Sequence, residues 1–310
     1  MNEQLEGVLP IHKPAGWTSH DVVAKMRRVL GMKRIGHTGT LDPDVTGVLP
    51  LCLNKATRFV EYLQERPKTY EAELTVGYAT DTEDASGAIL EQSEHIYLTQ
   101  ASIEQAIQPF TGTIRQVPPM YSAVKYKGKK LYELARQGIE IEREAREVVI
   151  HRLTLLSAEL TPRFPRIRFE AVCSKGTYIR TLCVDIGRKL GYPAVMSQLV
   201  RKETAGISLE RCLTIEEVEQ RQMNGTLTEA LIPADEAVSF IPKLVIEQSL
   251  ACRAAQGQRI RLQLQERIDT WSTDALVRLY DERGLFYGIY SLPAELSVLQ
   301  PVKVFLPTSR

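Results

Sequence analysis

One carboxylate stands in an unusually constrained stretch of the sequence. Residues 36–47 are GHTGTLDPDVTG, so Asp42 lies among glycines and is followed directly by Pro43. Glycine lets the backbone approach another group closely, and proline fixes the backbone after the aspartate. The pattern predicts a tightly turned loop that holds the Asp42 carboxylate in place. The Asp42 carboxylate could take part in a reaction, or it could form an Asx-turn that caps its own loop.

A cation that could act with this carboxylate occurs in the stretch SKGTYIR, residues 174–180. This stretch ends a predicted strand and opens a predicted helix, and helical spacing would place Thr177 and Arg180 on neighbouring turns. A guanidinium at such a site can bind a carboxylate through two parallel hydrogen bonds. The alternative is a surface ion pair, worth at most about 1 kcal/mol.

Aromatic and cationic side chains alternate in a third stretch, MYSAVKYKGKKLY at residues 120–132. Rings can stack on bases and ammonium groups can neutralise phosphates, so this composition suits RNA. Its cations are Lys125, Lys127, Lys129 and Lys130. A further tyrosine, Tyr70, stands after Lys68 and Thr69 at the start of a predicted strand, where it could also be a core residue.

Two short motifs offer other interpretations of the Asp42 loop. The stretch DPDVT at residues 42–46 matches the DxDxT signature of haloacid-dehalogenase-type phosphatases, in which the first aspartate is phosphorylated and Mg²⁺ is needed. The apolar run and the downstream carboxylates of those enzymes are missing from the sequence. Residues 31–38 nearly match a P-loop but lack its lysine and follow a helical pattern. The phosphatase remains the alternative enzyme.

Composition and charge exclude several classes of protein. With 310 residues, 44% of them hydrophobic and 25% charged, the chain can bury a proper core and is not disordered or fibrous. The net charge is only +1. Its distribution is uneven: residues 22–35, 120–136 and 174–202 are basic, whereas residues 69–114 contain eight acids and no Lys or Arg. The basic segments could converge on a polyanion, or they could be solvated helix faces.

The sequence also bears on the compartment. No apolar run approaches the roughly 20 residues of a membrane span, and MNEQLEGVLPIHKP lacks the features of a secretory signal. The five cysteines are scattered and form no CxxC pair, which argues against disulfides or structural zinc and favours core thiols. We therefore expect a cytoplasmic protein.

Periodicity predicts an α+β fold with a mixed, largely antiparallel central sheet flanked by helices, because strands and helices do not alternate regularly. The predicted elements are a helix capped at Thr18 with Asp21 and ended by Gly31, a half-buried strand over 70–77, a helix over 103–110, a strand over 165–174, a helix from about Thr177 to Leu190, and strands at 275–280, 285–290 and 302–306 with a turn at 281–284.

Several of these stretches, taken in order, resemble the TruB family of tRNA pseudouridine synthases. The resemblance rests on LPIHKP at 9–14, GHTGTLDPDVTGVLP at 36–50, KTY at 68–70, TDTEDASG at 80–87, PMYSAVKYKGKKLYELARQG at 119–138, SKGTYIRTL at 174–182 and LVR at 199–201. Long motifs in one order are far more specific than a single short one. The last 70 or so residues match the family's small β-rich appendage only loosely.

The resemblance implies a reaction and roles for particular residues. It implies that uridine 55 in the T-loop of tRNA is isomerised to pseudouridine after the base is flipped out of its stack. Asp42 would be the catalytic residue, Arg180 its partner, and Tyr70 the ring that stacks on the base. Tyr178 would contact the substrate, Leu199 would line the uracil pocket, and His37 would take up the space that the flipped base vacates.

The resemblance also implies a domain organisation and partners. Residues 1–240 would form the catalytic domain of the pseudouridine synthase fold, with residues 119–147 as a flexible, RNA-binding thumb. Residues 241–310 would form a small PUA-like domain. The T-arm stem-loop of tRNA would be the partner, with no membrane and no metal, and the protein would be a monomer. No cofactor is expected. An RNA-binding protein that performs no chemistry is the non-enzymatic alternative.

Overall fold

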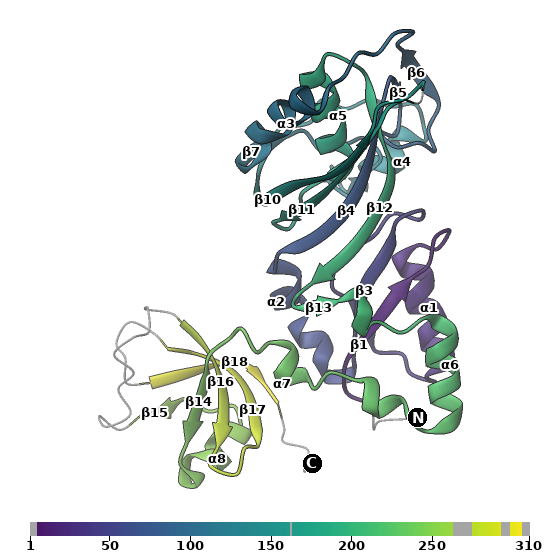
Figure 1. Ribbon diagram of the computed structural model, residues 1–310. Helices are drawn as coiled ribbons and strands as arrows, with labels where there is room; N and C mark the ends of the chain where they lie inside the picture. The colour runs from purple at the N-terminus through teal and green to yellow at the C-terminus, as the bar shows by residue number, and fades with distance from the viewer. Residues whose placement is uncertain (1–4, 162, 263–274, 293–297, 306–310) are drawn as a thin grey trace.

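The computed structural model describes residues 5–161, 163–262, 275–292 and 298–305. Within these residues one large sheet has nine strands in the order β1-β3-β12-β4-β11-β10-β7, with β2 paired to β3 and β13 to β12 (Figure 1). Its strands are β1 (Gly7–Lys13), β2 (Ile35–His37), β3 (Thr46–Leu53), β4 (Lys68–Val76), β7 (Gly112–Gln116), β10 (Arg146–Glu159), β11 (Arg166–Cys173), β12 (Ala194–Thr204) and β13 (Ile207–Ser208).

Helices and two small hairpins surround this sheet. In Figure 1 strands β4, β11 and β12 run between a part that carries α3 and α5 and a part that carries α1 and α6. The helices are α1 (Ser19–Val29), η1 (Asn54–Phe59), α2 (Val60–Glu65), α3 (Gln100–Ile107), η2 (Gln108–Phe110), α4 (Leu131–Ala135), α5 (Ile179–Leu190), η3 (Leu209–Arg211), α6 (Ile215–Asn224), η4 (Leu227–Ala230) and α7 (Ala234–Ala237). The hairpins are β5 (Tyr78–Thr80) with β6 (Ile89–Gln92), and β8 (Lys125–Tyr126) with β9 (Lys129–Lys130).

The predicted fold class is confirmed. Among the described residues the strand pairs of the large sheet are antiparallel, except that β12 runs parallel to β3. The core between α5 and the sheet is built from alternating residues of β4 and β11, such as Leu74 and Phe169, and from α5 residues such as Leu182. Burying these side chains is the main force that holds α5 against the sheet.

The prediction of a half-buried strand over 70–77 is wrong for the second half of β4. Glu73 and Thr75 are only 4% and 5% exposed, although they face away from Leu74. The Glu73 carboxylate accepts hydrogen bonds from Arg168 on β11 and from Ser197 on β12. Because β4 lies between these two strands, their polar side chains cover its second face.

Local signals predicted some helix ends correctly, but the helix predicted over 103–110 begins earlier, as α3 from Gln100 to Ile107, and its last residues form the 3₁₀ helix η2. Thr18 and Asp21 form the predicted capping box at the start of α1. Gly191 ends α5 in the left-handed conformation, at φ 85°. However, α5 begins only at Ile179, so Thr177 lies before the helix and does not share a helical face with Arg180. The predicted loop over 36–47 is also shorter, because its ends belong to β2 and β3.

A second sheet follows in the C-terminal region, as the sequence pattern predicts. Its order among the described residues is β14-β16-β17-β18-β15, with α8 (Gln248–Ala255) packed beside it. The strands are β14 (Lys243–Ile246), β15 (Ile260–Arg261), β16 (Ala275–Asp281), β17 (Phe286–Leu292) and β18 (Val298–Val304). The C-terminal region contacts the part of the chain that forms the large sheet. The ring of Phe59, at the end of η1, stacks on the ring of Phe305 with 4.8 Å between their centroids.

Three other sequence predictions can be compared with the described residues. Cys52, Cys173 and Cys183 are buried, but Cys252 is exposed, so the core-thiol prediction is wrong for that residue. None of the helices that these residues form combines the length and apolar composition of a transmembrane span. In the same part of the chain, no three His, Cys, Asp or Glu side chains gather in the manner of a metal site.

Gly47 fixes how closely β3 approaches its neighbours. It follows the Asp42 loop and pairs with Lys13 of β1 on one side and Arg201 of β12 on the other. Its φ is +111°, which L-residues rarely adopt, and a Cβ at this position would overlap the backbone carbonyl of Arg201. Any larger residue must therefore push β12 away from β3.

We predict that Gly47→Ala lowers the free energy of unfolding by about 3 kcal/mol or more, because backbone strain and overpacking add. Urea unfolding followed by circular dichroism measures this change. Gly191→Ala is the matched control, since its φ is also positive but a Cβ there meets open space, and we expect it to cost only about 1 kcal/mol. Equal losses in the two variants would contradict the prediction.

Candidate active site

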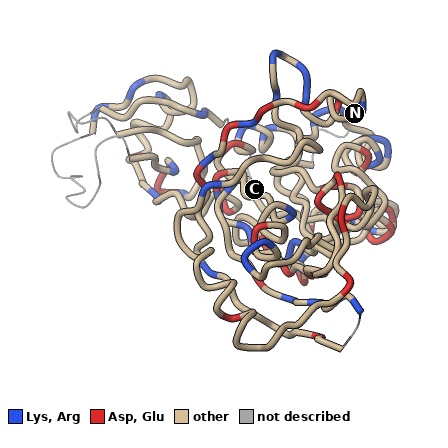
Figure 2. Tube along the Cα trace, turned by 90° about the horizontal axis from the view of Figure 1, so that it is seen from above, with Lys and Arg blue, Asp and Glu red and all other residues tan. Residues whose placement is uncertain are grey.

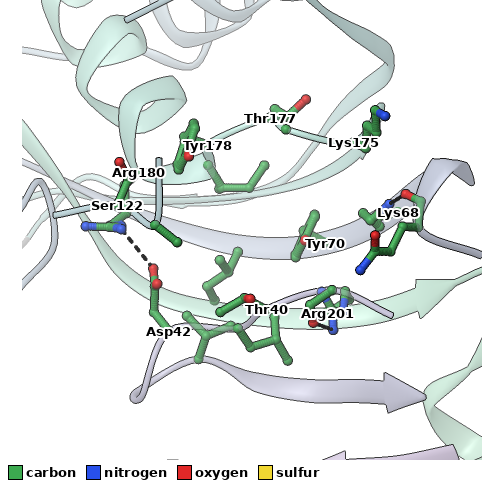
Figure 3. Close-up of a pocket in the computed structure, with 18 of the residues that line it drawn as sticks. Thr40, Asp42, Lys68, Tyr70, Ser122, Lys175, Thr177, Tyr178, Arg180 and Arg201 are labelled. Carbon is green, nitrogen blue, oxygen red and sulfur yellow. Dashed lines mark hydrogen bonds and ion pairs between the residues drawn. The ribbon is translucent and has the colours of Figure 1, made fainter. Parts of the chain in front are cut away.

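A cavity of about 340 Å³ opens at the junction of the Asp42 loop, β4, β12 and the start of α5 (Figure 3). It unites motifs that lie far apart in the sequence. The residues that line it are Thr38, Gly39, Thr40, Leu41, Asp42, Val45, Gln64, Lys68, Tyr70, Ser122, Ala123, Ser174, Lys175, Gly176, Thr177, Tyr178, Ile179, Arg180, Leu199 and Arg201. Five of the predicted site residues are in this set: Asp42, Tyr70, Tyr178, Arg180 and Leu199.

Asp42 and Arg180 meet at one end of the cavity. Figure 3 shows the Asp42 carboxylate pointing across it to the guanidinium, and their Oδ2 and Nη2 atoms lie 3.1 Å apart. The contact uses one guanidinium nitrogen, so the fork of two parallel bonds expected from the sequence is not formed. The carboxylate faces Arg180 instead of capping its own loop, and the Asx-turn interpretation is therefore wrong.

Backbone carbonyls and a second carboxylate also contact the Arg180 guanidinium. Its Nη1 donates to the Thr82 carbonyl and its Nη2 to the Tyr121 carbonyl, each at 2.8 Å. Its Nη1 also lies 3.8 Å from the Asp84 carboxylate. Because the Arg180 side chain is only 6% exposed, these contacts fix the guanidinium in one orientation. Sequence reasoning did not assign Thr82 or Asp84 to the site, although both lie in the TDTEDASG stretch.

Two features of the surroundings of Asp42 shift the pKa of its carboxyl in opposite directions. Burial among the cavity walls raises the pKa of its carboxyl above the ordinary aspartate value, and the charge of Arg180 opposes this shift. The side chain still has 44% of its surface accessible, because it opens into the cavity. The group is therefore surrounded by protein but can be reached by a ligand that enters the cavity.

Three side chains from other elements hold the loop that carries Asp42. The buried ammonium of Lys13 donates to the Pro43 carbonyl at 2.8 Å, and burial lowers its pKa to about 8. Arg201, only 1% exposed, donates to the carbonyls of Gly39 at 3.0 Å and Val48 at 2.7 Å. The hydroxyl of Ser19 accepts a hydrogen bond from the Leu41 amide.

These supports hold the loop on both sides of Asp42. Arg201 binds carbonyls before and after Asp42, whereas Lys13 binds one carbonyl of the loop and two within residues 14–17, so neither buried charge is left unpaired, which would be costly. The LVR stretch belongs to a family motif, but the sequence assigned Arg201 no role, because only the fold shows that this arginine points inward. Other polar residues also occur in β12, so its composition did not mark Arg201 as buried.

Two buried hydroxyls in the cavity wall are without hydrogen-bond partners among the described residues. Thr38 Oγ1 and Ser122 Oγ have none, and these residues are 1% and 5% exposed. Tyr70 is 8% exposed, and burial raises the pKa of its hydroxyl. The cavity therefore has the Tyr70 ring of β4 in its lining, while these two hydroxyl oxygens are buried in its wall.

Two sets of predicted residues lie outside the cavity. His37 is in β2, where its Nδ1 accepts a hydrogen bond from the Gly39 amide, and burial lowers its pKa, which favours the neutral ring. The lysines of the thumb segment, residues 119–147, lie on the hairpin of β8 and β9 and along its edges. They are exposed or half-buried, and they are Lys125, Lys127, Lys129 and Lys130.

Several basic side chains of the three segments are buried or paired with acids. Figure 2 shows Lys and Arg interleaved with Asp and Glu along the trace. In the third segment Arg180 and Arg201 are buried and bound to protein groups, and Lys175 pairs with Glu65. Part of the basic character seen in the sequence is therefore used inside the molecule.

Comparison with known proteins decides the family. Residues 27–179 match the model of the TruB family pseudouridylate synthase N-terminal domain, and residues 180–239 match that of the tRNA pseudouridylate synthase B C-terminal domain. The chain belongs to the TruB family of pseudouridylate synthases.

Relatives of this TruB-family protein are similar over their whole length. A protein of Geobacillus thermodenitrificans named tRNA pseudouridine synthase B is 48% identical over 307 residues, which cover 97% of this chain and 100% of the relative. One of Bacillus cytotoxicus with the same name is 45% identical over 306 residues, which cover 97% and 98%.

Solved structures share the fold of this TruB-family chain. The crystal structure of a Cbf5-Nop10-Gar1 complex matches with a TM-score of 0.73 and 27% identity, covering 97% of this chain and 85% of the other. An H/ACA RNP bound to a substrate RNA containing 2′-deoxyuridine matches with the same TM-score and 24% identity, covering the same shares of the two chains.

Proposed function

We propose that this protein isomerises uridine 55 in the T-loop of tRNA to pseudouridine. The reaction breaks the N1–C1′ bond, rotates the uracil and joins it again through C5, and the C5 proton exchanges with water. It is redox-neutral, so the chemistry itself calls for no redox cofactor. The observation that carries the proposal is the Asp42 carboxylate held 3.1 Å from a buried guanidinium in a cavity that the family motifs line.

Each site residue then has a chemical task. Ionised Asp42 reacts with the flipped nucleoside, and Arg180 orients its carboxylate and favours its charged form. Tyr70 stacks under the uracil, Tyr178 contacts the substrate, and Leu199 lines the uracil pocket. Because extrusion of a base costs a few kcal/mol, stacking on Tyr70, worth about 1–3 kcal/mol, offsets much of the cost.

The remaining parts of the protein grip the RNA. The neutral ring of His37 enters the space that the base leaves, while Lys125, Lys127, Lys129 and Lys130 bind phosphates of the T-arm stem-loop. The thumb segment closes over that stem-loop. We propose that residues 1–240 are the catalytic domain, that residues 241–310 are a PUA-like domain, and that the enzyme acts as a monomer.

Tritium release from tRNA labelled at uridine C5 tests the function directly. The purified protein should release one equivalent of tritium per T-loop, and the release should continue in excess EDTA. With an RNA-binding protein that performs no chemistry, the tRNA would retain its label. A phosphatase of the DxDxT type would lose its activity when EDTA removes Mg²⁺. Tritium retained by a protein that binds the T-arm would overturn the proposal.

The raised pKa of Asp42 predicts where kcat/KM falls on the acid side of its pH profile. Because the carboxylate must be ionised, kcat/KM should fall as the pH drops through the Asp42 pKa of the free enzyme. Burial raises that pKa above the ordinary aspartate value, so the acid limb should lie at higher pH than for an ordinary aspartate. Carboxyl-¹³C NMR should show the same pKa for a signal that is missing in Asp42→Asn. A limb at or below the pH of an ordinary, exposed aspartate would contradict the prediction.

A further inference from the structure

Gln116 makes an unusual pair of hydrogen bonds at the start of the helix that carries Arg180. It is the last residue of β7 and is only 2% exposed. Its Oε1 accepts a hydrogen bond from the Tyr178 backbone amide at 3.0 Å, and its Nε2 donates to the Tyr178 carbonyl at 3.2 Å. One side-chain amide thus binds both backbone groups of a single residue 62 positions away in the sequence.

The bonded residue occupies a sensitive position. Tyr178 is the N-cap of α5, and no side chain of its own caps the helix. Its carbonyl accepts the first helical hydrogen bond, from Leu182 at 3.0 Å. Gln116 Oε1 thus accepts from the N-cap amide, the contact that an N3 carboxylate makes in a capping box, and Gln116 Nε2 holds the N-cap carbonyl. Arg180 follows two residues later, so the position of the Tyr178 backbone determines the backbone position from which the Arg180 side chain extends.

The same strand end leads directly into the thumb segment. After Gln116 the chain passes through Val117, Pro118 and Pro119, and the two prolines restrict its backbone. Five residues beyond Gln116, the Tyr121 carbonyl accepts a hydrogen bond from Arg180 at 2.8 Å. The stretch 116–121 is thus attached to α5 at both of its ends, once at Tyr178 and once at Arg180.

We propose that Gln116 is a positioning residue that couples the base of the thumb segment to the Arg180–Asp42 pair. When the thumb segment closes on RNA, this attachment keeps the N-terminus of α5, and with it Arg180, at a fixed place relative to Asp42. Because Gln116 is only 2% exposed, it acts through Tyr178 and not by direct contact with the RNA. The inference rests on the proposed function, because its effect is measured on the isomerisation.

Gln116→Met tests the coupling, because methionine keeps the length and volume of the side chain but removes both hydrogen bonds. We expect the single-turnover rate of tritium release to fall by about 10- to 100-fold, the effect of a displacement near 1 Å. The dissociation constant for catalysis-independent tRNA binding should change by less than about threefold. Gln116→Glu keeps the acceptor for the Tyr178 amide, but its ionised form places a negative oxygen against the Tyr178 carbonyl in place of the donor, so its rate should also fall.

Gln92→Met is the matched control, since Gln92 is an exposed glutamine in β6, and it should retain the wild-type rate. If Gln116→Met does not fold, Gln116→Glu decides alone. A wild-type rate for the deciding variant, or a loss that lies wholly in tRNA affinity, would overturn the inference. A wild-type protein that releases no tritium would instead overturn the proposed function, and the two failures are thus distinct.

Discussion

Asp42→Asn should bind tRNA normally and make essentially no pseudouridine. The side chain keeps its shape, and its carbonyl oxygen can still accept a hydrogen bond from Arg180, so the cavity and the RNA-binding surface are preserved. What is lost is the negative charge that reacts with the flipped nucleoside. We expect the single-turnover rate to fall by at least about 10⁴-fold, as when the reacting group of other enzymes is removed. Quench-flow with labelled tRNA measures the rate, and filter binding measures the affinity.

The matched control for this variant is Asp44→Asn. Asp44 lies two residues further along the same loop and is exposed, so removal of its charge should change the rate by less than about threefold. This comparison separates the reacting carboxylate from the general charge of the loop. Clear pseudouridine formation by purified Asp42→Asn would rule out the assignment of Asp42 as the reacting residue.

Arg180→Lys should be the second most damaging change. The guanidinium uses two nitrogens to reach the Thr82 carbonyl, the Tyr121 carbonyl and the Asp42 carboxylate. A lysine has one nitrogen on a differently shaped side chain, so it cannot serve these acceptors together, although it keeps the charge. We expect the single-turnover rate to fall by about 10²- to 10³-fold, the usual loss when a preorganised donor is removed.

Arg188→Lys provides the control on the same helix. Its side chain is 76% exposed and pairs with Asp185 at the surface. Such a pair contributes little, so the variant should keep its rate and its stability. Circular dichroism and thermal unfolding of both variants show whether α5 is intact. An Arg180→Lys enzyme with near-normal turnover would show that charge alone is needed at this position.

The local features of the fold could be predicted because they depend on neighbouring residues. The capping box at Thr18 and Asp21, the end of α5 at Gly191 and the C-terminal strands follow from short-range hydrogen bonds and from the period of apolar residues. The second face of β4 could not be predicted in this way. Glu73 is buried only because Arg168 and Ser197 come from strands that are distant in the sequence.

For the site, the sequence by itself determined which groups are present. A carboxylate in a glycine- and proline-restricted loop, an arginine at the start of a helix and a tyrosine at the start of a strand are all recognisable from residue type and spacing. Their motifs also carry the resemblance to the family. Covalent neighbours are sufficient for this, because backbone restriction by Gly39 and Pro43 is a property of the chain itself.

Only the tertiary structure decided how these groups are held. The supports of the Asp42 loop come from β1, α1 and β12, and those of Arg180 come from the TDTEDASG stretch and the thumb segment. Gln116 meets Tyr178 across 62 positions of sequence. Hydrogen bonds between such distant residues leave no periodic trace in the sequence, since they depend on where the packing of the sheet brings each backbone carbonyl and amide.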